Sequence, residues 1–142
     1  MHCVIDGLFG EWSDIITVKT MKKLIDGFEK QFMKWLETDK LELLYRGSTD
    51  GMTEKVFHSK CDGQGPTVTL IKNGYGHIFG GYASVSWGKG NCWKQAPGSL
   101  IFTLTNAYDI PPTKFALRDE NTGKAVYHNK SVAQHLEIMI FA

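Results

Sequence analysis

The sequence predicts an α+β protein that is mostly β, a two-sheet antiparallel β-sandwich flanked by a long N-terminal helix and a short second helix. A strongly amphipathic stretch near the N-terminus is typical of a helix. From residue 41 onward, short strand-forming runs alternate with Gly, Pro and Asn turn signals, which is typical of a sandwich. The 142 residues suit a single domain, which we place at 13–142 after an irregular lead-in over 1–12.

The long helix is predicted over 21–36, because apolar residues recur there every three or four positions. They are Met21, Leu24, Ile25, Phe28, Phe32, Trp35 and Leu36. Gly27 lies inside the helix, where it costs about 1 kcal/mol relative to Ala and favours a kink or a close contact. The apolar stripe suits either a sheet of its own domain, which we favour because an apolar strand follows, or a partner protein.

The next segment is predicted to run from a strand through a turn into the short second helix. The strand covers 41–46, and Asp50-Gly51 is typical of a turn in which Gly takes a positive φ. The helix is predicted over 53–60, with the Thr53 side chain as its N-cap.

The remaining chain is predicted to be β-structure. Strands over 67–72 and 77–82 are joined by Asn73-Gly74, a strong hairpin signal. Gly80-Gly81 inside the second of them indicates a bulge or a close backbone approach. After a loop over 84–99, further strands are predicted at 100–105, 114–118, 124–129 and 135–141.

Composition excludes several classes of function. The net charge is +1, too small to attract nucleic acid or anionic lipid. Three cysteines without a Cys-x-x-Cys motif favour reduced thiols in the cytoplasm. The first residues lack a signal-peptide pattern, and no apolar run reaches the length of a membrane span. We therefore expect a cytoplasmic protein with no nucleic-acid partner, no transmembrane segment and no cofactor.

A redox-active thiol is one enzymatic alternative. Cys61 follows His58 by three positions on the predicted short helix. An imidazolium beside a thiol lowers the pKa of the thiol and makes it oxidisable. The interpretation that we favour is a buried small residue near a histidine with its own partner.

A hydrolytic site is the other enzymatic alternative. Its candidate residues are Ser48, Ser84 and Ser86, together with Asp50, His58 or His77. The chain has no Gly-x-Ser-x-Gly elbow to present a nucleophile, and residues of these types occur in any chain of this size. Two His/Cys pairs, His2-Cys3 and His58-Cys61, lack a convincing second pair, so we expect no metal site.

A protein-interaction surface is the main prediction. Loops carry function more often than strands, and Trp and Arg are enriched in binding hot spots. The candidate interaction residues are Arg46, Asp50, Ser84, Trp93 and Lys94. Trp87 is expected to close the end of the sandwich, whereas Trp93 suits a core position and a contact position equally.

A series of short blocks in a fixed order carries a family resemblance. The blocks are Leu43-Leu44-Tyr45-Arg46-Gly47-Ser48, Asp50-Gly51, Phe57-His58, Lys60-Cys61-Asp62, Gly65-Pro66-Thr67-Val68-Thr69-Leu70-Ile71-Lys72, Phe79-Gly80-Gly81-Tyr82, Ser99-Leu100-Ile101-Phe102-Thr103-Leu104, Pro111-Pro112, Lys114-Phe115 and Ala125-Val126-Tyr127. Together they resemble the TLDc domain, the TBC/LysM-associated domain of the oxidation-resistance type, over residues 13–131.

The resemblance implies a two-sheet sandwich flanked by helices in an intracellular, non-enzymatic interaction domain. Members of the family are linked to protection against oxidative stress. Some bind the vacuolar proton-pumping ATPase (V-ATPase) and regulate its assembly, so V-ATPase subunits are the expected partners. The family has no agreed catalytic mechanism.

The resemblance ends after Ser131. Where the family continues with a Gly-rich segment and an Asp-containing strand, this chain has 132–137 without such glycines. The departure predicts a missing part of one sheet and an unpaired strand edge, which is an aggregation hazard. A truncated, poorly functional variant is therefore a second alternative.

Overall fold

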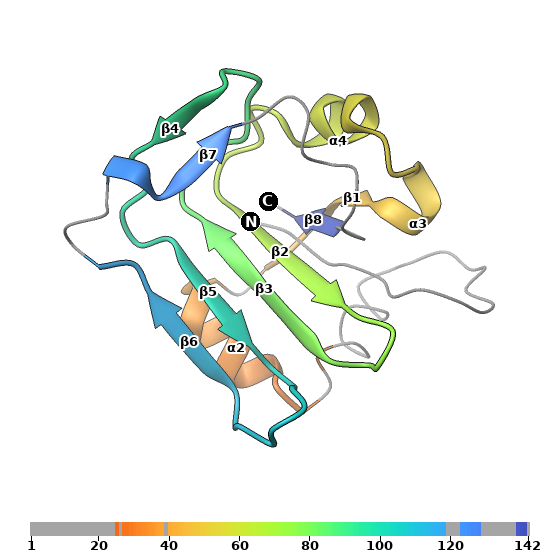
Figure 1. The fold of residues 1–142 in the computed structure, drawn as a ribbon, viewed down its shortest axis with the longest axis vertical. Coiled ribbons are helices and arrows are strands. Elements are labelled where there is room, and N and C mark those ends of the chain that lie inside the picture. The colour runs from red at the N-terminus through yellow and green to blue at the C-terminus, as the bar shows by residue number, and fades with distance from the viewer. Residues whose placement is uncertain (1–24, 26, 39, 119–122, 129–138, 142) are drawn as a thin grey trace.

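A six-stranded antiparallel sheet organises the fold (Figure 1). The computed structural model describes residues 25, 27–38, 40–118, 123–128 and 139–141. Across the sheet, the strands are β1 (Leu43–Arg46), β8 (Met139–Phe141), β2 (Thr67–Lys72), β3 (Ile78–Ala83), β5 (Leu100–Thr103) and β6 (Thr113–Ala116). A two-stranded ribbon pairs β4 (Cys92–Lys94) with β7 (Val126–His128). The prediction of a mostly β chain with two antiparallel sheets is confirmed, although the second sheet is small.

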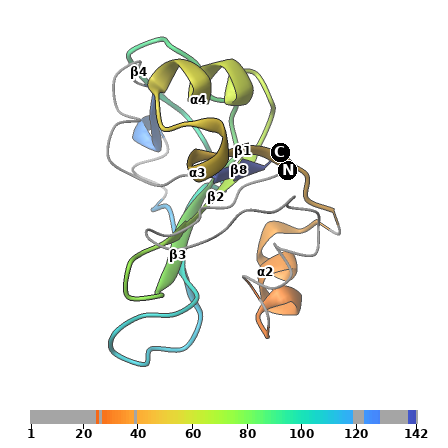
Figure 2. The same cartoon turned by 90° about the vertical axis from the view of Figure 1, so that its right-hand side faces the viewer.

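The core lies between the large sheet and the helix α2 (Glu29–Leu36). Figure 2 shows α2 to one side of the sheet. Phe32 of α2 is fully buried, and its ring meets the ring of Phe102 edge-on at 5.3 Å between centroids. Val68 and Leu70 of β2 are fully buried in the same cluster. We call this side of the sheet the inner face.

Of the long helix predicted over 21–36, the structure describes α2, which begins at Glu29, whereas residues 21–24 and 26 lie outside the described part of the chain. Gly27 has a φ of 84°, and the Phe28 N–H donates to the carbonyl of Ile25 at 2.7 Å. This glycine takes the conformation of a turn directly before α2.

Two short helices follow β1. The segment predicted as a turn forms one helical turn, α3 (Gly47–Asp50), and the Asp50 carboxylate accepts a hydrogen bond from the Arg46 N–H at 2.8 Å. The predicted short second helix is confirmed as α4 (Glu54–Cys61). The Thr53 hydroxyl accepts a hydrogen bond from the Val56 N–H at 3.4 Å, as expected of an N-cap.

The loop of the hairpin between β2 and β3 is longer than the two-residue turn that Asn73-Gly74 predicts. The Asn73 N–H donates to the carbonyl of His77, and its side-chain oxygen accepts from the N–H groups of Tyr75 and His77, all at 3.0 Å. The positive φ of this loop, 86°, falls at Gly76. The asparagine side chain thus holds the loop together.

Pairing through Gly80-Gly81 is regular, with Leu70 opposite Gly80 and Thr69 opposite Gly81. A Cβ built on Gly80 would lie 1.8 Å from the carbonyl oxygen of Thr69 and 3.0 Å from Cζ of Phe102. Of the two predicted roles for this pair, close backbone approach is therefore correct for Gly80, and a bulge is wrong.

The last strand lies inside the sheet. Phe141 of β8 pairs with Leu43 of β1 on one side and with Val68 of β2 on the other. The predicted strand over 135–141 is described only for 139–141. The expectation of an unpaired edge is wrong for β8, because both of its sides are hydrogen-bonded.

Candidate functional site

The β4–β7 ribbon presents an aromatic pair to solvent. Trp93 of β4 lies opposite Tyr127 of β7, with ring centroids 5.0 Å apart. The two residues are 52% and 42% exposed, although large aromatics are usually more buried. Lys94 follows Trp93 and is also exposed. The segment predicted as a loop over 84–99 therefore contains a strand, and this strand places Trp93 at the surface.

The other side of the ribbon packs against the body of the domain. His128 is buried, and its ring lies 6.1 Å from that of Trp87. Trp87 donates its indole N–H to the hydroxyl of Thr67 at 2.9 Å, and its ring packs edge-on against Phe57 at 5.7 Å. Burial, and secondarily the charge of Lys94, lower the pKa of His128. A neutral imidazole thus seats the ribbon on Trp87, which takes the packing role expected for it.

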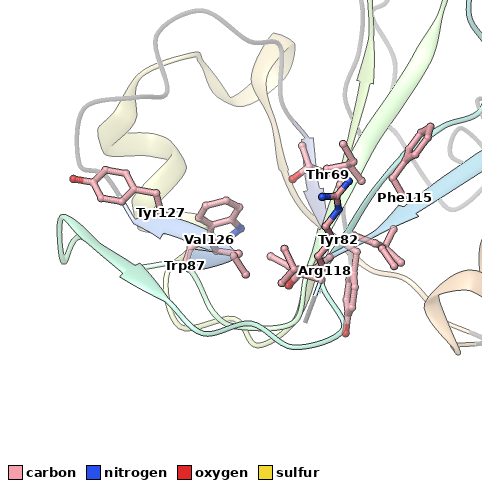
Figure 3. Close-up of a pocket in the computed structure, with 15 residues that line it drawn as sticks. Thr69, Tyr82, Trp87, Phe115, Arg118, Val126 and Tyr127 are labelled. Atoms are coloured by element: carbon pink, nitrogen blue, oxygen red, sulfur yellow. The ribbon is translucent and has the colours of Figure 1, made fainter. Parts of the chain in front are cut away.

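A pocket of about 550 Å³ lies between the ribbon and the face of the sheet opposite α2. We call this side of the sheet the outer face. The outer pocket is lined by Thr69, Gly81, Ile101 and Phe115 of the sheet, by Val126 and Tyr127 of the ribbon, and by Trp87 and Arg118, among others. Figure 3 shows Thr69, Phe115 and Arg118 on one side, and Trp87 and Val126 on the other, with the Tyr127 ring directed outward from the ribbon.

Two predicted interaction residues, Arg46 and Asp50, instead tie β1 to its neighbouring helices. Arg46 is 5% exposed, and burial lowers the pKa of its guanidinium. Besides accepting from the Arg46 backbone, the Asp50 carboxylate forms an ion pair with Lys60 of α4 at 2.6 Å. Asp50 therefore links β1, α3 and α4.

Ser84, the third predicted interaction residue, joins the end of β3 to the start of β5. Its N–H donates to the Ser99 hydroxyl at 3.0 Å, and the two hydroxyls lie 3.3 Å apart. The nearby Ser86 hydroxyl accepts from the N–H of Gly65 at 2.9 Å. Of the five predicted interaction residues, Trp93 and Lys94 are thus the exposed ones.

The thiol proposed for redox chemistry is fully buried. Cys61 has no exposed surface, and burial raises its pKa to about 12, with a smaller contribution from Asp62. His58 does not activate it in the expected way, since His58 Nδ1 lies 2.8 Å from the Asp62 carboxylate. A thiol with that pKa is ionised in roughly one molecule in 10⁵ at pH 7.

We therefore expect iodoacetamide at pH 7.5 to alkylate the half-buried Cys92 at least about tenfold faster than Cys61 in the folded protein. Mass spectrometry of tryptic peptides measures both rates, and the chain unfolded in urea is the control in which the two rates converge. Equal rates in the folded protein would contradict the burial of Cys61.

The buried thiol also makes the stability of the domain depend on pH. Because the pKa of Cys61 is raised from 9.0 on folding, the free energy of unfolding that this thiol contributes is lost as the pH increases above 9.

Two kinds of site are absent from the described residues. No group of three or more His, Cys, Asp or Glu side chains is placed there to hold a metal ion. No described helix combines the length and apolar character needed to cross a bilayer.

Sequence reasoning did not single out Ile101, Phe115, Arg118 and Tyr127 of the outer pocket. The sequence does hold a signal for Tyr127. It lies between Val126 and His128 in a predicted strand, so strand alternation places its side chain on the opposite face from theirs. No local signal shows that Ile101 and Phe115 are solvent-exposed neighbours, because their pairing joins two different strands.

Comparison with known proteins identifies a domain family. The model of the TLDc domain matches residues 9–139. Over 110 residues, covering 71% of this chain and 24% of its relative, the sequence is 27% identical to MTOR-associated protein MEAK7 of Danio rerio. Over 51 residues, 36% of this chain and 11% of its relative, it is 43% identical to Interferon-induced protein 44 of Homo sapiens. The chain thus spans a quarter or less of these relatives, and it belongs to the TLDc domain family.

Proposed function

We propose that this TLDc domain is a non-enzymatic, cytoplasmic interaction module that binds subunits of the V-ATPase and contributes to protection against oxidative stress. Membership of the family supports a role in protein binding. The observation that carries the proposal is the exposed pair of Trp93 and Tyr127 on the β4–β7 ribbon. Exposed aromatic residues held rigidly by a strand are typical anchors of protein interfaces.

The contact surface is centred on Trp93 and Tyr127, which share one face of the ribbon. Lys94 is the cross-strand partner of Val126, so its exposed side chain leaves the ribbon from the opposite face. The other predicted residues, Arg46, Asp50 and Ser84, support the fold: the first two join β1 to α3 and α4, and Ser84 joins the end of β3 to the start of β5. Two exposed aromatic rings on one face of the ribbon favour a partner surface with an apolar centre.

Affinity pull-down from cell extract with the tagged chain, followed by mass spectrometry, tests the partner. We expect subunits of the peripheral stalk or the catalytic head of the V-ATPase to be retained. Because one relative is named as associated with MTOR, recovery of an MTOR complex without pump subunits would replace the V-ATPase as partner. Recovery of neither from well-folded protein would overturn the proposal.

We expect Trp93→Ala to weaken binding of the retained subunit by about thirtyfold, the loss typical of a hot-spot aromatic. Isothermal titration calorimetry with the purified subunit measures the change. Tyr75→Ala is the matched control, because Tyr75 is 89% exposed in the β2–β3 hairpin, away from the ribbon. If the two variants bind equally well, the ribbon is not the contact surface.

A further inference from the structure

The floor of the outer pocket is a gap in the side chains of the outer face. Thr69, Gly81 and Ile101 lie side by side across β2, β3 and β5, and the middle residue has no side chain. A Cβ added to Gly81 would lie 3.3 Å from the carbonyl oxygen of Leu100 and 3.6 Å from Cγ2 of Ile101. The glycine therefore leaves a depression in the sheet between larger neighbours.

The walls of this depression are apolar and remain in contact with water. Ile101 is 64% exposed, and its cross-strand partner Phe115 is 52% exposed. Val126 of the ribbon and the ring of Trp87 contribute the opposite side. The volume of about 550 Å³ falls within the range of pockets that enclose small molecules. A hydrocarbon group placed here would remove this apolar surface from water.

One side chain gives the pocket a positive charge. Of the described residues that line it, Arg118 alone is charged, and Figure 3 shows its side chain among the other lining groups. A guanidinium presents five N–H donors in a planar fork that matches the two oxygens of a carboxylate, and it can serve more than one acceptor. An apolar cavity with a single such group suits a ligand that is apolar over most of its length and anionic at one end.

We propose that the outer pocket binds a small amphipathic carboxylate, with its hydrocarbon chain over Gly81 and Ile101 and its carboxylate on Arg118. The proposal goes beyond the binding of a protein partner, and it does not require one. Tyr127 lines the pocket and also belongs to the proposed protein contact, but the pocket does not use Trp93, the residue that tests that contact. The purified chain therefore tests it independently of any V-ATPase subunit.

The experiment is calorimetric titration of the purified chain with decanoate and, separately, with decanol, both below their aggregation concentrations. We expect saturable binding of one decanoate per chain, at least about tenfold tighter than decanol, because only decanoate pairs with the guanidinium. In a series from octanoate to decanoate, affinity should rise about fourfold per added methylene until the pocket is full.

Two variants and a control locate the site. Arg118→Gln should weaken decanoate binding about tenfold or more and leave decanol binding unchanged. Ile101→Asp, which adds a carboxylate to an exposed position on the floor, should weaken both ligands. Lys114→Gln is the control, because it removes a cation from β6, four residues before Arg118, at an exposed position opposite Phe102 of the inner face.

Three results would overturn the proposal. The first is decanoate that binds no more tightly than decanol, the second is a loss of binding in Lys114→Gln as large as in Arg118→Gln, and the third is the failure of either ligand to saturate at one site per chain. The last result, together with a loss of protein-partner binding on Ile101→Asp, would instead identify the outer pocket as part of the protein interface. Circular dichroism of each variant confirms that the fold is retained.

Discussion

Gly80→Ala should destabilise the domain by about 3 kcal/mol or more, a substantial part of the stability of a domain of this size. The added methyl would lie 1.8 Å from the carbonyl oxygen of Thr69, so the backbone of β2 or β3 has to move. Such a shift would break ladder hydrogen bonds between the two strands with the longest pairing in the sheet. Urea denaturation followed by tryptophan fluorescence measures the change in the free energy of unfolding.

Gly81→Ala is the matched control for this substitution. It lies one position further along the same strand, and its added methyl would lie 3.3 Å from the nearest atom, the Leu100 carbonyl oxygen. A shift of a few tenths of an ångström accommodates it, so we expect a cost of about 1 kcal/mol. If the two alanine variants are equally stable, the close approach of Thr69 to Gly80 does not determine the packing of β2 against β3.

The second large effect is expected from Phe32→Ala, at about 3–5 kcal/mol of destabilisation. The Phe32 ring is fully buried between α2 and the sheet, and it meets Phe102 edge-on. Its removal leaves a cavity that the surrounding strands cannot fill without moving. The same urea titration measures the loss, and the helical signal in circular dichroism shows whether α2 detaches.

Phe115→Ala is the control for the truncation of a phenylalanine. Phe115 lies on the edge strand β6 with 52% of its surface exposed, so its loss should change stability by about 1 kcal/mol or less. Equal losses for Phe32→Ala and Phe115→Ala would contradict the assignment of the inner face as the core. A larger loss for Phe115→Ala would mean that the outer face is covered in solution.

The predictions that succeeded rest on local physical chemistry. Thr53 was recognised as an N-cap because a β-hydroxyl satisfies an open N–H within the same turn. The strands were recognised from their alternation and flanking turn residues, which are also local. The packing of the partly buried Trp87 against the core follows from the same reasoning, since a large aromatic gains most from burial.

Other features depended on partners that the local pattern does not show or on one backbone angle. The pattern over 21–36 continued through Gly27, but the observed φ of 84° places a turn there. Arg46, Asp50 and Ser84 are polar residues of the kind found at interfaces, yet their partners are backbone groups and a side chain of adjoining elements. A sequence lists donors and acceptors without showing which of them meet.

The sequence by itself determined the mostly β character of the chain, the short helix after Thr53 and, through its ordered blocks, membership of the TLDc family. Only the tertiary structure decided that β8 enters the sheet between β1 and β2, that Trp93 is exposed on a ribbon, and that Gly81 and Arg118 share a pocket. The reason is that strand order and burial arise from pairings across long stretches of chain. Periodicity, caps and turns report only the nearest few residues.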